Sequence, residues 1–202
     1  SRTVTIVRPS KGVLAEAREP EAMRVCAYAL MPSHFHLMLW PRADGDLSRS
    51  MQWLTMTHTQ RWLAHRHSIG RGHLYQSRFK SFPIQQDEHF LRVCRHVERN
   101  ALRARLVKQA EDWQWCSLAC RERKLPKAEA LLDDWPVDGP RGWRRLVNEP
   151  QSEKELGRLH TCLRRGQPCG DEAWTCRTVV KLGLESSLRR VGRPRKVVEK
   201  AE

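Results

Sequence analysis

The chain lacks any apolar stretch that approaches the roughly 18 uninterrupted residues of a transmembrane helix. It also shows no long basic amphipathic segment and no secretory leader, so we expect a cytoplasmic protein without a membrane partner. Acidic residues are in the minority, with 23 Asp and Glu against 37 Lys and Arg, and the formal net charge is +14. The positive charges repel one another unless an anionic partner neutralises them, and nucleic acid is the leading candidate.

A disulfide framework is missing as well. The seven cysteines are an odd number at irregular spacing, which favours reduced, buried thiols. Cys162, Cys169 and Cys176 follow His160, so a zinc-stabilised structural protein is an alternative. The two close Cys-x2-Cys pairs that are typical of structural zinc sites are absent, however.

The 202 residues, 40% of them hydrophobic, suffice for one sizeable core or for one core with a small appended module. From residue 24 to residue 40 the sequence predicts two strands separated only by Pro32 and Ser33. This gap is too short for a helical crossover, so the strands form a β-hairpin and the sheet is antiparallel. Thr3 to Val7 indicates a further short strand, and residues 12–21 carry helix formers.

Two histidines directly follow the first of these strands. In an extended chain His34 and His36 share one face, while Phe35, Leu37 and Leu39 share the other. Two imidazoles on one face are half of a metal site. The alternative is a half-buried strand with two polar residues on its solvated face.

Two long helices are predicted next. Asp46 is the expected N-cap of a helix that ends at about His67. Asp87 is the expected N-cap of a second helix that ends at about Leu106. The apolar side of the second helix comprises Phe90, Cys94, Val97 and Ala101. Its opposite side comprises His89, Arg92, His96, Asn100 and Arg103. Imidazole, amide and guanidinium groups bind metals and phosphates, although a plain solvated face is the alternative.

Past residue 122 the organisation changes. Proline and glycine predict a Trp- and Pro-rich linker over 123–151. A helical extension follows over 152–202, with Ser152 and Glu155 as a capping box and Asp171 capping a further helix. The two helices are a hairpin or a DNA-reading helix-turn-helix. Gly192-Arg193-Pro194 in the basic tail is typical of an AT-hook core, or of a solvated tail.

Four segments together resemble the REP-associated tyrosine transposases, which belong to the HUH single-tyrosine insertion-sequence transposases. The similarity runs in order from residue 24 to about residue 120, and residues 152–196 are similar to an extension that some members carry. The segments that carry it are Met31-Pro32-Ser33-His34-Phe35-His36-Leu37, Gly72-His73-Leu74-Tyr75-Gln76-Ser77-Arg78-Phe79-Lys80, Leu91 to Ala104, and Asp112-Trp113-Gln114-Trp115-Cys116-Ser117-Leu118.

The resemblance implies an α+β domain over 24–122, with a ferredoxin-like antiparallel sheet flanked by helices, after a shortened lead over 1–23. It implies that His34, His36 and Asn100 hold Mg²⁺ or Mn²⁺ against a phosphate of single-stranded or hairpin DNA. In the family a tyrosine then attacks that phosphate, so DNA is cleaved and rejoined during transposition. Relatives often dimerise, and whether this chain does is left open.

The chain departs from the family at the nucleophile, because His96 stands where the tyrosine is expected. Tyr28 and Tyr75 are the only tyrosines, and Tyr75 is a candidate substitute. His96 is itself either a nucleophile or an additional metal ligand. The chain is therefore either an enzyme of this family or a catalytically inactive DNA-binding module derived from one.

Basic residues from several segments are expected to contact DNA. Tyr75 and Phe79 lie between cations that suit a phosphate backbone, and the alternative is that these aromatic residues belong to the core of a strand. The basic residues are Arg71, His73, Arg78, Lys80, Arg92, Arg103, Arg193 and Arg195.

Overall fold

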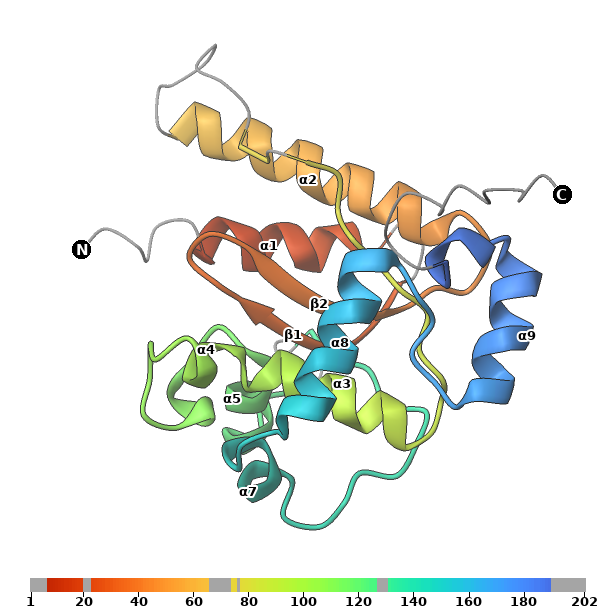
Figure 1. The fold of residues 1–202 in the computed structure, drawn as a ribbon. Coiled ribbons are helices and arrows are strands. Elements are labelled where there is room, and N and C mark those ends of the chain that lie inside the picture. Colours follow the sequence, from red (N-terminus) through yellow and green to blue (C-terminus); the bar gives the residue numbers. More distant parts are fainter. Residues whose placement is uncertain (1–6, 20–22, 66–73, 76, 127–130, 190–202) are drawn as a thin grey trace, which may run out of the picture.

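A two-stranded antiparallel sheet lies at the centre of the computed structural model (Figure 1). The structure describes residues 7–19, 23–65, 74–75, 77–126 and 131–189. Strand β1 (Arg24–Leu30) pairs with β2 (Phe35–Trp40), with an irregularity in register between Val25 and Ala27. The predicted hairpin and the α+β class are thus confirmed. The ferredoxin-like sheet stays a prediction, since these two strands are the only sheet within the described part of the chain.

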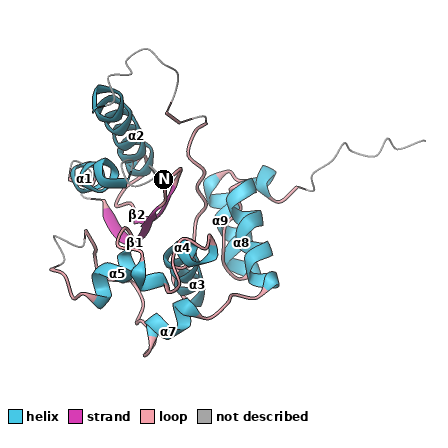
Figure 2. Cartoon of the chain, turned by 90° about the vertical axis from the view of Figure 1, so that its left-hand side faces the viewer, coloured by secondary structure: helices cyan, strands magenta, loops and turns pink. Residues whose placement is uncertain are grey.

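Helices cover both faces of the hairpin (Figures 1 and 2). On one side α1 (Val7–Ala17) and α2 (Asp46–His65) pack together, and their apolar residues meet the odd-numbered side chains of β2, as strand alternation predicts. On the other side α3 (Glu88–Glu98) packs against both strands. The side of β2 that carries His36 therefore faces α3.

Three helix boundaries differ from the sequence prediction. Val7 begins α1 instead of ending a strand, while residues 3–6 lie outside the described residues. Asp46 is not an N-cap, because its carboxylate accepts hydrogen bonds from the backbone of the preceding loop, at Arg42 N (3.0 Å) and Ala43 N (2.7 Å). The second predicted helix breaks at Arg99, and a single turn, α4 (Asn100–Arg103), follows.

Side chains from distant segments cover the outer edge of β1. Asp133 accepts a hydrogen bond from Val25 N (2.8 Å) and its own N–H donates to Val25 O (2.9 Å). Ser117 Oγ accepts from Tyr28 N at 3.1 Å. Two indoles complete the edge: Trp135 Nε1 donates a hydrogen bond to Cys26 O (2.8 Å), and Trp113 Nε1 donates one to Leu30 O (3.0 Å). The strand edge is thereby satisfied without a third strand.

A fully buried carboxylate, Glu98 at the end of α3, joins three helices. Its Oε1 accepts from Ser117 Oγ (2.5 Å) at the start of α5 (Ser117–Glu122), and from Arg121 Nε (3.4 Å). Its Oε2 accepts from the indole of Trp143 (2.6 Å) at the start of α7 (Trp143–Asn148). Burial raises the pKa of Glu98, which Arg121 opposes. Glu98 therefore fixes α3 relative to α5, α7 and the edge of β1.

The C-terminal helices α8 (Glu153–Arg165) and α9 (Glu172–Leu182) start and end where the caps predict. Ser152 and Glu155 form the capping box of α8, and Asp171 accepts from Trp174 N at the start of α9. The turn between the helices pairs with the segment before α3, where Cys169 N donates to Pro83 O (2.8 Å). Helix α8 crosses in front of α3 in the view of Figure 1, and both helices contribute to the same hydrophobic core.

Short 3-10 turns cover Ala110–Asp112 and Glu185–Ser187. All seven cysteines are free thiols in this structure, six of them buried and only Cys176 exposed, and the expected reduced state stays a prediction. None of the helices in the described ranges has the length and apolarity needed to cross a bilayer.

Candidate metal and nucleic-acid site

The two motif histidines lie at the start of β2. His34 is the last residue of the turn that joins the strands, and its carbonyl accepts a hydrogen bond from Met31 N (2.8 Å). Its ring is exposed, with Nδ1 3.1 Å from Ser33 Oγ, and lies 5.0 Å from the ring of His36. The hairpin turn therefore brings the two imidazoles together at one end of the sheet.

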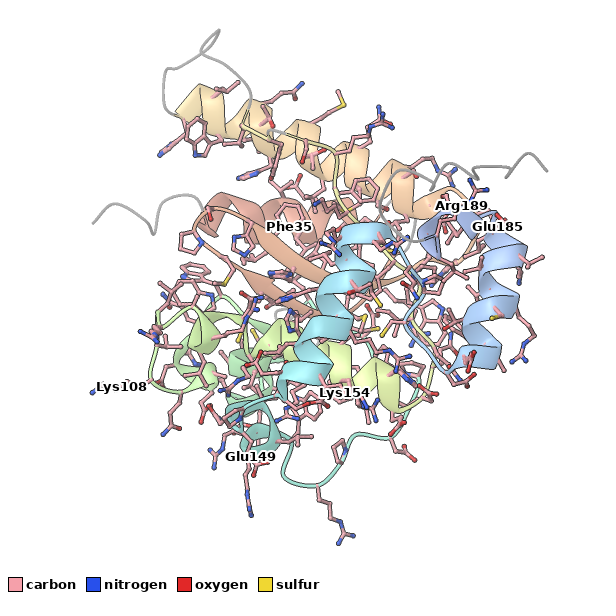
Figure 3. The ribbon with its side chains drawn as sticks, in the orientation of Figure 1. Phe35, Lys108, Glu149, Lys154, Glu185 and Arg189 are labelled. Carbon is pink, nitrogen blue, oxygen red and sulfur yellow. The ribbon has the colours of Figure 1, made fainter. Side chains whose placement is uncertain are left out.

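His36 points away from α1 and α2. Its neighbour Phe35 packs among the residues of α1 and α2, and Figure 3 labels it on that side of the hairpin. The ring of His36 instead lies 6.2 Å from the ring of His96 on α3. Its Nε2 is buried and has no hydrogen-bond partner among the described residues. A buried, unpartnered imidazole nitrogen is the expected donor of a site that binds a cation.

Three of the five residues on the predicted polar side of α3 and α4 are buried rather than solvated. His89, His96 and Asn100 are each less than a tenth exposed. Helix α8 covers this side, and His160 of α8 lies 6.2 Å, ring to ring, from His96. The exposed Arg103 brings its NH1 to 3.3 Å from His160 Nε2.

His160 joins the other histidines across the fold, and sequence reasoning missed it as part of this site. No spacing signal identifies it, because the contact forms only when α8 packs on α3.

The surroundings of three imidazoles, His34, His36 and His96, lower their pKa values and so favour the neutral form. Burial lowers the pKa of His36 to about 3, with the nearby positive charges of His34, His96 and Arg103 as smaller causes. Burial likewise lowers the pKa of His96 to about 4, and Arg103 adds to the effect. The pKa of His34 is also lowered by burial. Neutral imidazoles keep the lone pairs that bind metals.

These observations test whether a divalent cation fits. The unpartnered Nε2 of His36, the buried and unpartnered Nδ1 of His96, and the neutral rings all suit one. Asn100 follows His96 by one turn; its buried Nδ2 is an unpartnered donor, and only its Oδ1 can bind a cation. In the arrangement observed for the described residues, no three His, Cys, Asp or Glu side chains converge closely enough to hold an ion. The histidine pair therefore fits a cation, and further ligands require side chains to rotate.

A cavity of about 420 Å³ opens beside the histidines, which is a typical size for a ligand site. All four histidines of the cluster line it, together with Arg78 and Lys80 from the segment before α3. Both of these cations are exposed, and Phe79 between them is 39% exposed. Arg92 forms an ion pair with Glu88 (3.0 Å) instead. The remaining predicted DNA contacts, Arg71, His73, Arg193 and Arg195, lie outside the described residues.

Residues 6–100 match the family model of the IS200-like transposases. Over these residues the chain is similar to the transposase domain of that family. Comparisons with curated proteins and with solved structures gave no match. The matched region of the transposase domain ends at Asn100, so it includes His34, His36 and His96, whereas α8 and His160 lie beyond it.

Neither tyrosine of this chain occupies the position of His96. Tyr75 hydrogen-bonds His58 Nδ1 through its hydroxyl (2.5 Å) and packs against Phe35, on the side away from His36. Burial raises its pKa to about 12. Tyr28 lies in β1, fully buried, with its hydroxyl 3.1 Å from Cys120 Sγ, and burial raises its pKa as well. Tyr75 also lines the cavity of the histidines, but its hydroxyl is bonded to His58, and the hydroxyl of Tyr28 lies at Cys120.

Proposed function

We propose that this chain is a transposase-derived protein that binds single-stranded or hairpin DNA and retains the metal-capable histidines of its family without the covalent nucleophile. The similarity to the IS200-like transposase domain supports the DNA partner. The cavity offers cations and an exposed aromatic ring, the combination that suits a flexible phosphate backbone with unstacked bases.

The observation that carries the proposal is the pairing of His36 with His96. His36, whose Nε2 is buried and unpartnered among the described residues, has its ring centroid 6.2 Å from that of the residue that stands in place of the tyrosine. His34 and His36 would hold Mg²⁺ or Mn²⁺, with the amide of Asn100 as a further ligand, and such a cation withdraws charge from a bound phosphate. The chain itself orients that phosphate through Arg78, Lys80 and Arg103.

The tyrosine-based covalent step of the family would need a hydroxyl at the place of His96. The hydroxyl of Tyr75 is hydrogen-bonded to His58, and its ring packs against Phe35. For it to attack a phosphate at the histidines, this packing must be broken. Binding without formation of a protein–DNA bond is therefore the function that the geometry supports best.

DNA affinity tests the proposal. We expect a labelled hairpin strand to bind more tightly than a duplex of equal length, with an affinity that falls steeply with salt. The double variant Arg78→Ala/Lys80→Ala should weaken binding and reduce the slope of log affinity against log salt by roughly 2, because two phosphate contacts are lost.

The matched control is Arg141→Ala/Arg145→Ala, which removes the same charge from two exposed positions at α7. It should leave the salt slope nearly unchanged. Equal losses in the two double variants, or a preference for duplex, would show that the cavity does not bind the strand.

A further inference from the structure

Two buried cysteines, Cys162 and Cys169, meet where α8 ends. Cys162 lies in the last turn of α8, and Cys169 lies in the turn that leads to α9. Gly166, with a left-handed φ of 67°, ends the helix and reverses the chain, so that Gln167 N donates to Cys162 O (3.2 Å). Both cysteines are 2% exposed, and their thiols are hydrogen-bonded to each other. The fold therefore brings two free thiols into contact.

The backbone around Cys169 is anchored on both sides. Its N–H donates to Pro83 O (2.8 Å), and its carbonyl accepts from Gln85 N (2.9 Å). Arg158 of α8 donates a hydrogen bond to the carbonyl of the next residue, Gly170. Because this backbone is already ordered, the pair loses little freedom when an S–S bond of about 2.05 Å forms.

A cavity of about 220 Å³ gives small molecules a route to the thiols. Cys162, Arg158 and Thr161 are among its lining residues. A water molecule takes about 30 Å³ of liquid, and hydrogen peroxide is only slightly larger, so it fits into this opening. The buried pair is therefore accessible to a small oxidant.

The surroundings give the two thiols different tasks. The hydrogen bond with Cys162 lowers the pKa of Cys169, and the positive charges of Arg158 and Arg92 lower it further, against the effect of burial. The same hydrogen bond raises the pKa of Cys162, and burial adds to this effect. Cys169 is thus the thiol that more readily becomes a thiolate, the form that attacks an oxidant, while Cys162 keeps its proton.

We propose that Cys162 and Cys169 form a reversible disulfide when the protein is exposed to a hydroperoxide. The thiolate of Cys169 attacks one oxygen of hydrogen peroxide, and the O–O bond breaks. The hydroxide that leaves takes up the proton that Cys169 had released and becomes water. The sulfur of Cys162 then attacks the sulfenic acid at Cys169, the S–S bond forms, and the thiol proton leaves with the hydroxyl as a second water. Two thiols are oxidised by two electrons, and one peroxide is reduced to two waters.

The disulfide would act on the contact between the C-terminal extension and the rest of the fold. It cross-links the end of α8 to the turn before α9, and this turn pairs with residues 83–85 through Cys169. That segment follows Arg78 and Lys80 and leads into α3. Oxidation therefore holds the extension in the arrangement in which it contacts the segment ahead of α3.

Peptide mapping after oxidation tests the proposal on the full chain. The protein carries Cys176→Ser, because Cys176 is exposed and lies in the same tryptic peptide as Cys169, residues 166–177. It is treated with hydrogen peroxide, unfolded, alkylated at its remaining thiols and digested with trypsin. We expect peptide 166–177 to be linked to peptide 159–164, which carries Cys162, and the link to disappear on reduction.

Two further cysteines provide the matched control. Cys116 and Cys120 are also buried and lie four positions apart at α5, and both should remain alkylated. Cys162→Ser and Cys169→Ser, each in the same background, should lose the link. A link to Cys116 or Cys120 instead, or a Cys169 that stays free or stops at a sulfinic acid, would overturn the proposal. The experiment contains no DNA, so its outcome is independent of the proposed function.

Discussion

Replacement of Glu98 by alanine should strongly destabilise the protein. This carboxylate is fully buried and accepts hydrogen bonds from Ser117 and Trp143, while the guanidinium of Arg121 lies 3.4 Å away. It lies two residues after His96 on α3. Glu98 therefore holds the helix that presents His96 to the strand histidines.

The size of the stability loss follows from the hydrogen-bond partners and the cavity that remain when the Glu98 side chain is shortened. The indole of Trp143 loses its acceptor (2.6 Å), and an unsatisfied buried donor costs about 1–3 kcal/mol. Ser117 keeps a second acceptor, Tyr28 O at 3.2 Å, so its loss is smaller. The cavity left by the shortened side chain adds about 1–3 kcal/mol. Arg121 contributes little, because it is partly exposed and also donates to Cys26 O (2.6 Å).

We therefore expect Glu98→Ala to lose about 3–5 kcal/mol of unfolding free energy, a large part of the stability of a typical domain. Urea unfolding, followed by tryptophan fluorescence and circular dichroism, measures it. Glu149→Ala is the control, since Glu149 forms only a surface ion pair with Arg145, and it should change stability by less than about 0.5 kcal/mol. A loss below about 1 kcal/mol in Glu98→Ala would refute the reasoning.

Three further predictions concern stability and thiol exposure. Burial raises the pKa of Glu98 above its ordinary 4.5, so the native state keeps a proton that the unfolded chain loses. The free energy of unfolding should therefore fall as pH rises from about 4.5 through the raised pKa. Urea titrations at several pH values should show a smaller fall in Glu98→Gln. Gly170→Ala should lower the melting temperature, because the added Cβ would lie 2.3 Å from the Trp174 ring; Gly157→Ala, with open space around its Cβ within α8, should leave it unchanged or raise it. A thiol reagent should label one cysteine rapidly in the native protein, Cys176, and all seven after unfolding; loss of labelling in Cys176→Ser identifies it.

Local signals in the sequence predicted the hairpin and several helix ends. Pro32 and Ser33 leave no room for a crossover, and Asp87, Ser152 and Asp171 cap the helices as their side chains predict, with bonds to backbone N–H groups. Alternation along β2 also gave the correct face for His36. Each of these features depends on residues within a few positions of one another.

Features that depend on distant segments could not be predicted in this way. Much of the polar side of α3 is buried because α8, more than fifty residues later, packs over it and brings His160 to His96. The edge of β1 is satisfied by Asp133 and Ser117, which lie far along the chain. Arg99, at the break, also contacts a distant segment, where its guanidinium donates to Val147 O at 2.9 Å. None of these contacts has a periodicity that the sequence reveals.

Formation of a covalent protein–DNA adduct tests most directly whether the site has lost its nucleophile. The native chain, His96→Tyr and Tyr75→Phe are each incubated with Mn²⁺ and a 3′-labelled hairpin strand, and the label that migrates with protein is measured on a denaturing gel. We predict no adduct with the native chain and a labelled adduct with His96→Tyr, whose hydroxyl faces His36. A native adduct that disappears in Tyr75→Phe would contradict the account.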